Sequence, residues 1–233
     1  KEHREIWGGY LDGNKANQAS GNSILIWRGS ASIIRDTVIY DAKDDGLKYF
    51  GTNWTGWAGL HCAFNVRIYN SGSNGIYCNY HNDNLFDECI VQSSGSHNVV
   101  LYGIYRLFYV HSIYAGGYSF YLPEGCDGTR LIECDADTPD AGQNNIVIGG
   151  DRCAVIGGYV HGQGSGYDCI RFLATASDNE VNGVHCSGGN YAVNEISGAD
   201  YNLIVCNVGR SITQGDAFHL TGTNSIEANN LIT

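Results

Sequence analysis

The sequence predicts an all-β fold, a right-handed parallel β-helix of about nine coils, in a single domain that covers residues 1–233. Three observations predict this fold class. The chain is rich in turn-forming residues, with 32 Gly and only two Pro, which favours many tight turns over long helices. Two columns of core residues recur at a shared interval of roughly 22 to 26 residues. No helical pattern lies between the two columns.

The first column follows a turn-like pair of residues in each coil. Asn22-Ser23 precedes Ile24, and Asp45-Gly46 precedes Leu47. Two residues after Ile24 and Leu47, a further apolar residue follows in each coil. This alternation is the period-2 pattern of a strand with one buried face. The expected members of this column are Ile24, Leu47, Ile76, Val99, Phe120, Ile146, Ile170, Val193 and Phe218.

The second column predicts another short strand in every coil. In a solenoid, each strand pairs in parallel with its equivalent one coil away, at about 4.8 Å, so that like residues stack on like. Leucine-rich and ankyrin repeats fit poorly, because their consensus patterns are absent. We expect His111 to be a core histidine satisfied by a backbone carbonyl. The expected buried members are Thr37, Val66, Cys89, His111, Cys134, Gly158, Val184, Cys206 and Asn229.

The nine cysteines require a test of a disulfide framework. Within the second column, another coil separates Cys89 from Cys134, so their separation is near ~10 Å, which is too long for a disulfide. We therefore expect no two cysteines to stack directly and most of them to be buried, reduced thiols. No Cys-x-x-Cys pair occurs, so no metal site is predicted.

The formal net charge of −11 narrows the class of partner. An acidic surface repels nucleic acid and anionic membranes, so neither is expected as a partner, and no apolar run is long enough for membrane insertion. A neutral glycan or a cation-bridged ligand fits better. The chain has no Met, even at position 1, which indicates a segment of a longer protein. An extracellular or virion-surface location is favoured.

Two short motifs resemble those of a known family. The stretch IWGGYLDGN from Ile6 to Asn14 is similar to the segment GG-x-Ile-Asp-Gly-Asn that opens domains of the pectin-lyase-like β-helix superfamily. Asp44-Asp45-Gly46-Leu47 is similar to the Asp-Gly-Ile strand entries of that superfamily, although Asp-Gly is also what a tight turn favours. The superfamily includes pectate lyases, polygalacturonases and the tailspike depolymerases of phages. The resemblance therefore implies polysaccharide binding and cleavage by a glycoside hydrolase or a lyase.

Outward positions beside the second column form the candidate catalytic site. Asp135 and Asp137 are two residues apart on one strand and share a face, and His161 and His185 follow on the next coils. Two carboxyls so placed could be the general acid and base of glycoside cleavage. The histidines could hold a proton or bind a sugar hydroxyl. The alternative is a group of solvated polar residues on an exposed sheet.

Aromatic side chains suggest a substrate groove on the same face. Flat rings cover the faces of sugars while their hydroxyls stay wet, although such a ladder can also simply stabilise stacked strands. Two tryptophans lie in a Gly-rich loop of the longest coil and either pack back or meet a partner. The candidate binding residues are Tyr40, Tyr69, Tyr114, Tyr159, Trp54, Trp57 and Arg67. No cofactor is predicted, and the presence of calcium is left open.

A non-catalytic role is the second hypothesis. The polygalacturonase Arg-x-Lys clamp and Gly-His-Gly turn are absent, so the rod could be a viral tail or fibre module, or a surface protein, that binds glycan or acts as a spacer. Both ends of the chain, Ile6-Trp7 and Leu231-Ile232, lie in strand-like sequence. Exposed coil edges would need caps, flanking domains or partner chains, as in a homo-oligomer such as a trimer.

Overall fold

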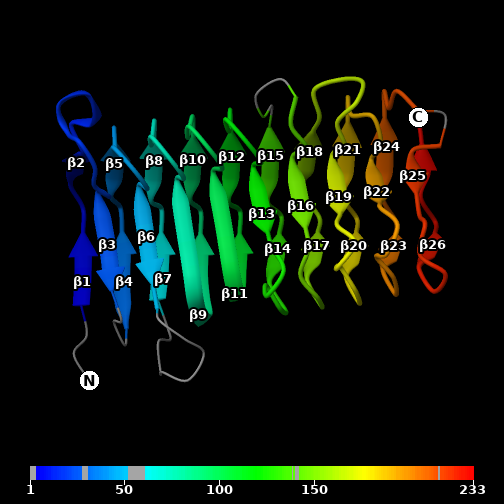
Figure 1. Ribbon diagram of the computed structural model, residues 1–233, viewed down its shortest axis with the longest axis horizontal. Coiled ribbons are helices and arrows are strands. Elements are labelled where there is room, and N and C mark those ends of the chain that lie inside the picture. The colour runs from blue at the N-terminus through cyan, green and yellow to red at the C-terminus, as the bar shows by residue number, and fades with distance from the viewer. Residues whose placement is uncertain (1–3, 28–30, 52–60, 138, 140–141, 215) are drawn as a thin grey trace.

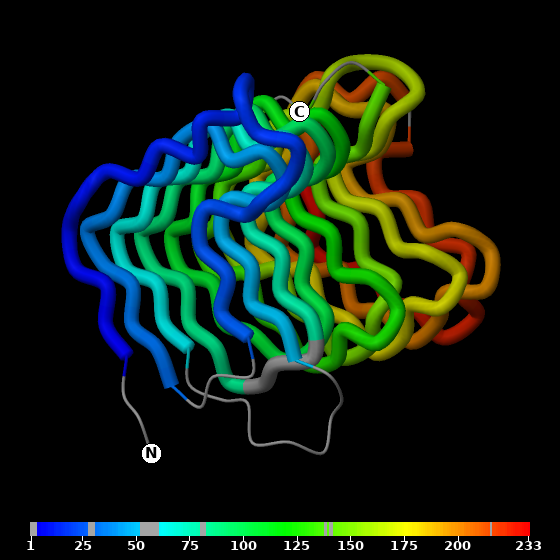
Figure 2. The backbone as a smooth tube through the Cα atoms, turned by 60° about the vertical axis from the view of Figure 1, so that its left-hand side comes forward, coloured from blue at the N-terminus to red at the C-terminus, as the bar shows by residue number. Residues whose placement is uncertain are grey.

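The computed structural model describes residues 4–27, 31–51, 61–137, 139, 142–214 and 216–233. The chain winds into a rod of stacked parallel coils, with the first and last coils at opposite ends (Figure 1). The predicted right-handed parallel β-helix of about nine coils is confirmed. Each coil contributes strands to three faces, which run the length of the rod as stacked layers (Figure 2).

The first face confirms the first predicted column. Ile24 pairs in register with Leu47, and the same pairing continues coil by coil to Phe218. The core-facing residues of these strands are almost all buried. The strands are β3 (Ile24–Trp27), β6 (Leu47–Phe50), the first part of β9 (Ile76–Asp87), the first part of β11 (Val99–Phe108), β13 (Phe120–Leu122), β16 (Ile146–Ile148), β19 (Ile170–Phe172), β22 (Val193–Glu195) and β25 (Phe218–His219).

The second face was not predicted from the sequence. β9 and β11 run on from the first face into the second without a break and join the two faces into one 17-stranded sheet. Elsewhere a connecting segment of variable length separates the two strands, so the strands of this face do not follow those of the first face at a constant sequence interval. Its other strands are β1 (Arg4–Trp7), β4 (Ser32–Arg35), β7 (His61–Phe64), β14 (Arg130–Ile132), β17 (Ala154–Ile156), β20 (Glu180–Asn182), β23 (Leu203–Val205) and β26 (Ile226–Ala228).

The third face is a separate ten-stranded parallel sheet. A residue with positive φ often turns the chain into it, as at Asp36, Asn65 and Glu133. The helix η1 (Lys15–Asn17) follows its first strand. The strands are β2 (Tyr10–Asp12), β5 (Val38–Tyr40), β8 (Arg67–Tyr69), β10 (Ile90–Gln92), β12 (His111–Ile113), β15 (Asp135–Asp137), β18 (Tyr159–His161), β21 (His185–Ser187), β24 (Val208–Arg210) and β27 (Leu231–Ile232).

Three members of the second predicted column are wrong by one residue. The core-facing positions are Val110, Asn207 and Asn230 in place of His111, Cys206 and Asn229. His111 pairs with the outward Asp135, and Val208 and Leu231 continue the outward row of His185. Cys206 and Asn229 adopt φ of 56° and 57° at the corner that precedes the strand. His111 is therefore not a core histidine. Among the residues whose burial is described, His61 is a fully buried histidine, and its Nδ1 lies 2.8 Å from the hydroxyl of Ser32.

Inward-facing amides hold the bends of successive coils together. The Oδ1 of Asn207 accepts a hydrogen bond of 2.9 Å from the backbone N–H of Val184, and the Oδ1 of Asn230 accepts one of 2.8 Å from Asn207. Each amide thus satisfies a backbone donor of the neighbouring coil.

All nine cysteines are free thiols. The expectation that no two cysteines stack directly is wrong at one place. The Sγ atoms of Cys126 and Cys153 lie 3.9 Å apart in the bend between the first and second faces, outside the column from which the expectation was drawn.

No helix among the described residues has the length and apolar character needed to cross a bilayer. Both ends of the rod expose apolar side chains: Trp7 and Tyr10 at one end and Ile226, Leu231 and Ile232 at the other.

Candidate functional site

The outer surface of the third face brings together all four predicted catalytic residues. Asp135 and Asp137 project from β15, His161 from β18 and His185 from β21. Tyr159, a predicted binding residue, lies opposite His185 in the register. We call Asp135, Asp137, Tyr159, His161 and His185 the polar cluster.

Asp135 is oriented by the next coil. Gly157 and Gly158 take φ of 65° and 82°, and after this bend the backbone N–H of Tyr159 donates a 2.9 Å hydrogen bond to Oδ1 of Asp135. On its other side, Asp135 lies in register with His111. The Asp137 side chain is partly exposed, and its carboxylate makes no hydrogen bond to the described part of the protein.

His111 is an outward residue that sequence reasoning missed. The coil that leads to β12 is one residue shorter than the predicted register requires. The prediction therefore placed His111 in the core and Ser112 on the surface, which is the reverse of their positions in the structure. The run Tyr109-Val110 carries the missed signal. Tyr109 takes a left-handed φ of 51° at the corner, and Val110 is the buried residue that follows.

Tyr159 and His161 form a hydrogen-bonded group with Ser187. His161 Nδ1 lies 2.9 Å from Ser187 Oγ, and the Tyr159 hydroxyl lies 2.5 Å from the same oxygen. The ring of Tyr159 is stacked with His161 at 6.2 Å and meets His185 edge-on at 5.3 Å. Ser187 was not predicted as a site residue, because a serine on a strand carries no distinctive signal by itself.

Tyr40 and Tyr69 belong to an aromatic ladder nearer the N-terminal end of the same face. The ring centroids of Tyr10 and Tyr40 are 6.2 Å apart, and those of Tyr40 and Tyr69 are 6.4 Å apart. The prediction that Tyr114 shares this row is wrong. Tyr114 adopts a φ of 51° at the corner after β12, and Ile113 occupies its expected place in the register.

The ladder and the polar cluster are separated along the rod. Arg67 is exposed on β8 beside the ladder. From β8 to β15 there are three strand steps, which span ~14 Å. Trp54 and Trp57 lie outside the described residues.

The Asp-Gly motif has a structural role. The Asp44 carboxylate accepts a 2.7 Å hydrogen bond from Gly21 N–H, and Asp45 is buried between Lys48 Nζ at 2.8 Å and the Asn74 amide at 2.9 Å. The bonds with Gly21 and Asn74 join adjacent coils, whereas Lys48 belongs to the same coil as Asp45.

The first face carries a second aromatic surface that sequence reasoning missed. Trp27 and Phe50 have ring centroids 5.3 Å apart, and Tyr77 and Tyr102 follow at 6.1 Å. Lys48 Nζ lies 4.8 Å above the Tyr77 ring. These outward residues alternate with the core column, so the period-2 pattern could have revealed them.

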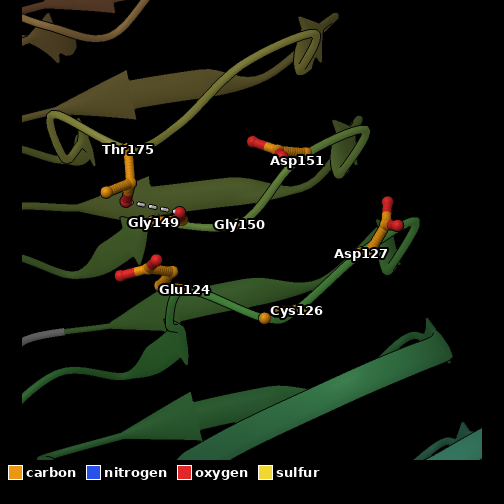
Figure 3. Close-up of a pocket in the computed structure, with 8 residues that line it drawn as sticks. Glu124, Cys126, Asp127, Gly149, Gly150, Asp151 and Thr175 are labelled. Atoms are coloured by element: carbon orange, nitrogen blue, oxygen red, sulfur yellow. Dashed lines mark hydrogen bonds between the residues drawn. The ribbon is translucent and has the colours of Figure 1, made fainter.

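A pocket of about 410 Å³ lies at the bend between the first and second faces (Figure 3). Its acidic side chains do not converge: Glu124 and Asp127 lie at opposite ends of the pocket in Figure 3, and Asp127 is paired with Arg152. In the part of the chain that the structure describes, no group of three or more His, Cys, Asp or Glu side chains is arranged to hold a metal ion.

Comparison with solved structures identifies the fold. The A-module of the mannuronan C-5 epimerase AlgE4 from Azotobacter vinelandii superposes with a TM-score of 0.73 at 15% identity, over 95% of this chain and 73% of that one. The chain is a right-handed parallel β-helix. This β-helix also matches the enzymatically active domain of tailspike protein 2 from bacteriophage CBA120, with a TM-score of 0.70 at 14% identity over 98% of this chain.

The full-length tailspike protein 2 gives a TM-score of 0.65 at 14% identity. The β-helix spans 38% of the tailspike active-domain chain and 34% of the full-length tailspike chain. No family model and no curated protein sequence matches the chain. The resemblance noted in the N-terminal stretch is therefore confirmed as a likeness of fold.

Proposed function

We propose that this β-helix binds a polysaccharide along the outer surface of its third face and cleaves it at the polar cluster. The observation that carries the proposal is the gathering of two aspartates, two histidines and a tyrosine on one outward surface of three consecutive strands, β15, β18 and β21. The Tyr10–Tyr40–Tyr69 ladder lies on the same sheet and offers ring faces to further sugar units. The fold neighbours, a mannuronan epimerase module and a tailspike enzymatic domain, support a carbohydrate ligand.

The two carboxylates have different surroundings, which suits different roles. Asp135 is fixed by the Tyr159 N–H and acts as the general base. Asp137 faces the ligand and protonates the glycosidic oxygen. Residues two apart on a strand have Cα atoms about 7 Å apart, a spacing that leaves room for a water molecule between the carboxyls, as in inverting hydrolysis. His161 and His185 bind sugar hydroxyls.

A non-catalytic glycan-binding module is the second candidate. The observation that favours it is that Tyr159 and His161 already bond to Ser187, as solvated polar residues on a structural sheet would. In that case the rod is a tail, fibre or surface module that holds a polysaccharide without cleaving it.

The test is a screen of neutral and acidic polysaccharides for binding, for release of reducing ends and for the ultraviolet absorbance of the unsaturated sugars that a lyase makes. We expect the double variant Asp135→Asn/Asp137→Asn to keep its affinity and to lose turnover by at least ~100-fold. Asp178→Asn, an exposed aspartate in a bend remote from the third face, is the matched control and should leave turnover unchanged.

Full turnover in the double variant would reject the catalytic assignment. Binding without any cleavage by the native protein would select the non-catalytic role. Unsaturated products would show that the site carries out a lyase reaction and not hydrolysis.

A further inference from the structure

Ser187 has surroundings that glycoside cleavage by two aspartates does not use. Its hydroxyl lies 2.9 Å from the Nδ1 of His161 and 2.5 Å from the hydroxyl of Tyr159. The residue is only 7% exposed, so bulk water has little access to the hydroxyl. A serine hydroxyl bonded to an imidazole is the arrangement that activates a nucleophile for acyl transfer.

A carboxylate lies in the same row. The register pairs Asp137 with His161 and His161 with Ser187, so aspartate, histidine and serine follow one another on the adjacent strands β15, β18 and β21. Neighbours in register on adjacent strands are about 4.8 Å apart. In its ionised form, which it takes once it has given up its proton, the Asp137 carboxylate is thus placed to stabilise the imidazolium that forms when His161 accepts a proton.

We propose that Ser187 is a nucleophile, with His161 as its base, and that this part of the third face removes ester-linked acyl groups, such as O-acetyl groups, from the bound polysaccharide. The inference rests on the proposed function for its substrate class. It assigns a separate reaction to a residue that has no part in glycoside cleavage.

Every atom of the reaction is accounted for by groups in the site and by water. The Oγ of Ser187 attacks the ester carbonyl carbon while His161 takes the hydroxyl proton. The tetrahedral intermediate then breaks its bond to the sugar oxygen, and His161 returns the proton to that oxygen, which leaves as an alcohol. His161 then deprotonates a water molecule, which attacks the acyl-serine carbonyl carbon. The bond from that carbon to Ser187 Oγ breaks, His161 returns the proton to Oγ, and the carboxylic acid leaves. The Tyr159 hydroxyl is within reach of the carbonyl oxygen as its negative charge develops.

The test uses probes that need no glycan recognition: p-nitrophenyl acetate as a chromogenic ester and a fluorophosphonate as a covalent label of activated serines. We expect the native protein to hydrolyse the ester and to gain one fluorophosphonate adduct, which peptide mass spectrometry maps to Ser187. Ser187→Ala should abolish both signals, whereas Ser177→Ala, in a bend remote from the third face, should change neither.

An acetylated polysaccharide, acetyl xylan, then tests the natural class of substrate through acetate release. Ser187→Ala should lose acetate release while it keeps glycan binding and the release of reducing ends. Absence of both the adduct and ester hydrolysis in the native protein would overturn the esterase assignment and leave the proposed function standing. A native protein that forms the Ser187 adduct but binds no glycan would instead overturn the proposed function alone.

Discussion

At the scale of single residues, the interior of the rod tolerates charge only where donors surround it. Glu195 is fully buried, and its carboxylate accepts hydrogen bonds from the Asn202 amide at 2.6 Å, the Gly222 N–H at 2.7 Å and the Ser225 hydroxyl at 2.7 Å. The backbone N–H of Thr221 adds a fourth at 2.9 Å. One side chain therefore ties the turn of the last coil to the coil before it.

Replacing Glu195 with Leu should lower the free energy of unfolding by about 3 kcal/mol, because the buried Asn202 amide and three part-buried donors lose the carboxylate that accepts from them. Urea unfolding followed by circular dichroism measures the change. Glu227→Leu, at an exposed glutamate on β26, is the matched control and should cost less than about 0.5 kcal/mol. Equal losses for the two variants would refute the structural role of Glu195.

Residue roles could be predicted from the sequence only where the register was right. Asp135, Asp137, Tyr159 and His161 were placed on one surface because their coils have regular lengths. His111 and Tyr114 were misplaced because a single missing residue reverses which side chains face the core. Ser187 could not be recognised at all, since its significance comes from two hydrogen bonds across coils.

At the scale of elements, the first face was predictable and the second was not. The first face has a turn-like pair before nearly every strand, so the sequence pattern alone places its nine strands in register. The second face follows connections that range from none, inside β9 and β11, to the long segment between β6 and β7. A strand that lacks a recurring turn-like pair before it cannot be located from its sequence spacing alone.

The bend before β18 illustrates how an element positions the site. Gly158 has a φ of 82°, and a Cβ at this position would overlap the carbonyl oxygen of Cys134 in the neighbouring coil. Gly164 has the same φ of 82° but open space around it. A comparison of substitutions at the two glycines therefore distinguishes the cost of steric overlap from the cost of backbone strain.

Gly158→Ala should destabilise the β-helix by roughly 2 kcal/mol more than Gly164→Ala, since both substitutions share the strain of a left-handed alanine and only the first adds overlap with backbone. Thermal unfolding provides the comparison. Gly158→Ala should also reduce any glycan turnover, because Tyr159 and its bond to Asp135 would move. Identical melting temperatures for the two variants would contradict the described bend.

At the scale of the whole molecule, the rod is stabilised by one continuous core that contains most of its thiols. Burial raises the pKa of Cys89 and of Cys134 from an ordinary 9.0 to about 12. A folded-state pKa above the unfolded value contributes stability that is complete below pH 9.0 and is lost as the pH rises toward 12.

The β-helix should therefore lose stability progressively above about pH 9, as the unfolded chain ionises thiols that the folded chain keeps protonated. Urea unfolding at a series of alkaline pH values measures this dependence. Cys89→Ala/Cys134→Ala should have a flatter profile above pH 9 than the native protein, even though it is less stable at neutral pH. A native profile that stays level up to pH 11 would show that these thiols are not buried.

Association of the rod with flanking domains or further copies stays a prediction, which the exposed apolar side chains at its ends support. Trp7 at one end and Ile226 at the other are 71% and 58% exposed. Covering these ends by flanking domains or by further copies of the chain, as in a trimer, would remove that surface from water. Light scattering of the purified chain over a range of concentrations measures the association that this predicts.

The central claim is that stacked coils bring distant residues together into one polysaccharide site on the third face. The most direct measurement is a crystal structure of Asp135→Asn/Asp137→Asn bound to an oligosaccharide selected by the polysaccharide screen. We predict sugar units that extend from the Tyr40–Tyr69 ladder to the polar cluster, with a glycosidic oxygen within hydrogen-bonding reach of residue 137. An oligosaccharide bound instead along Trp27, Phe50 and Tyr77 on the first face would contradict the account.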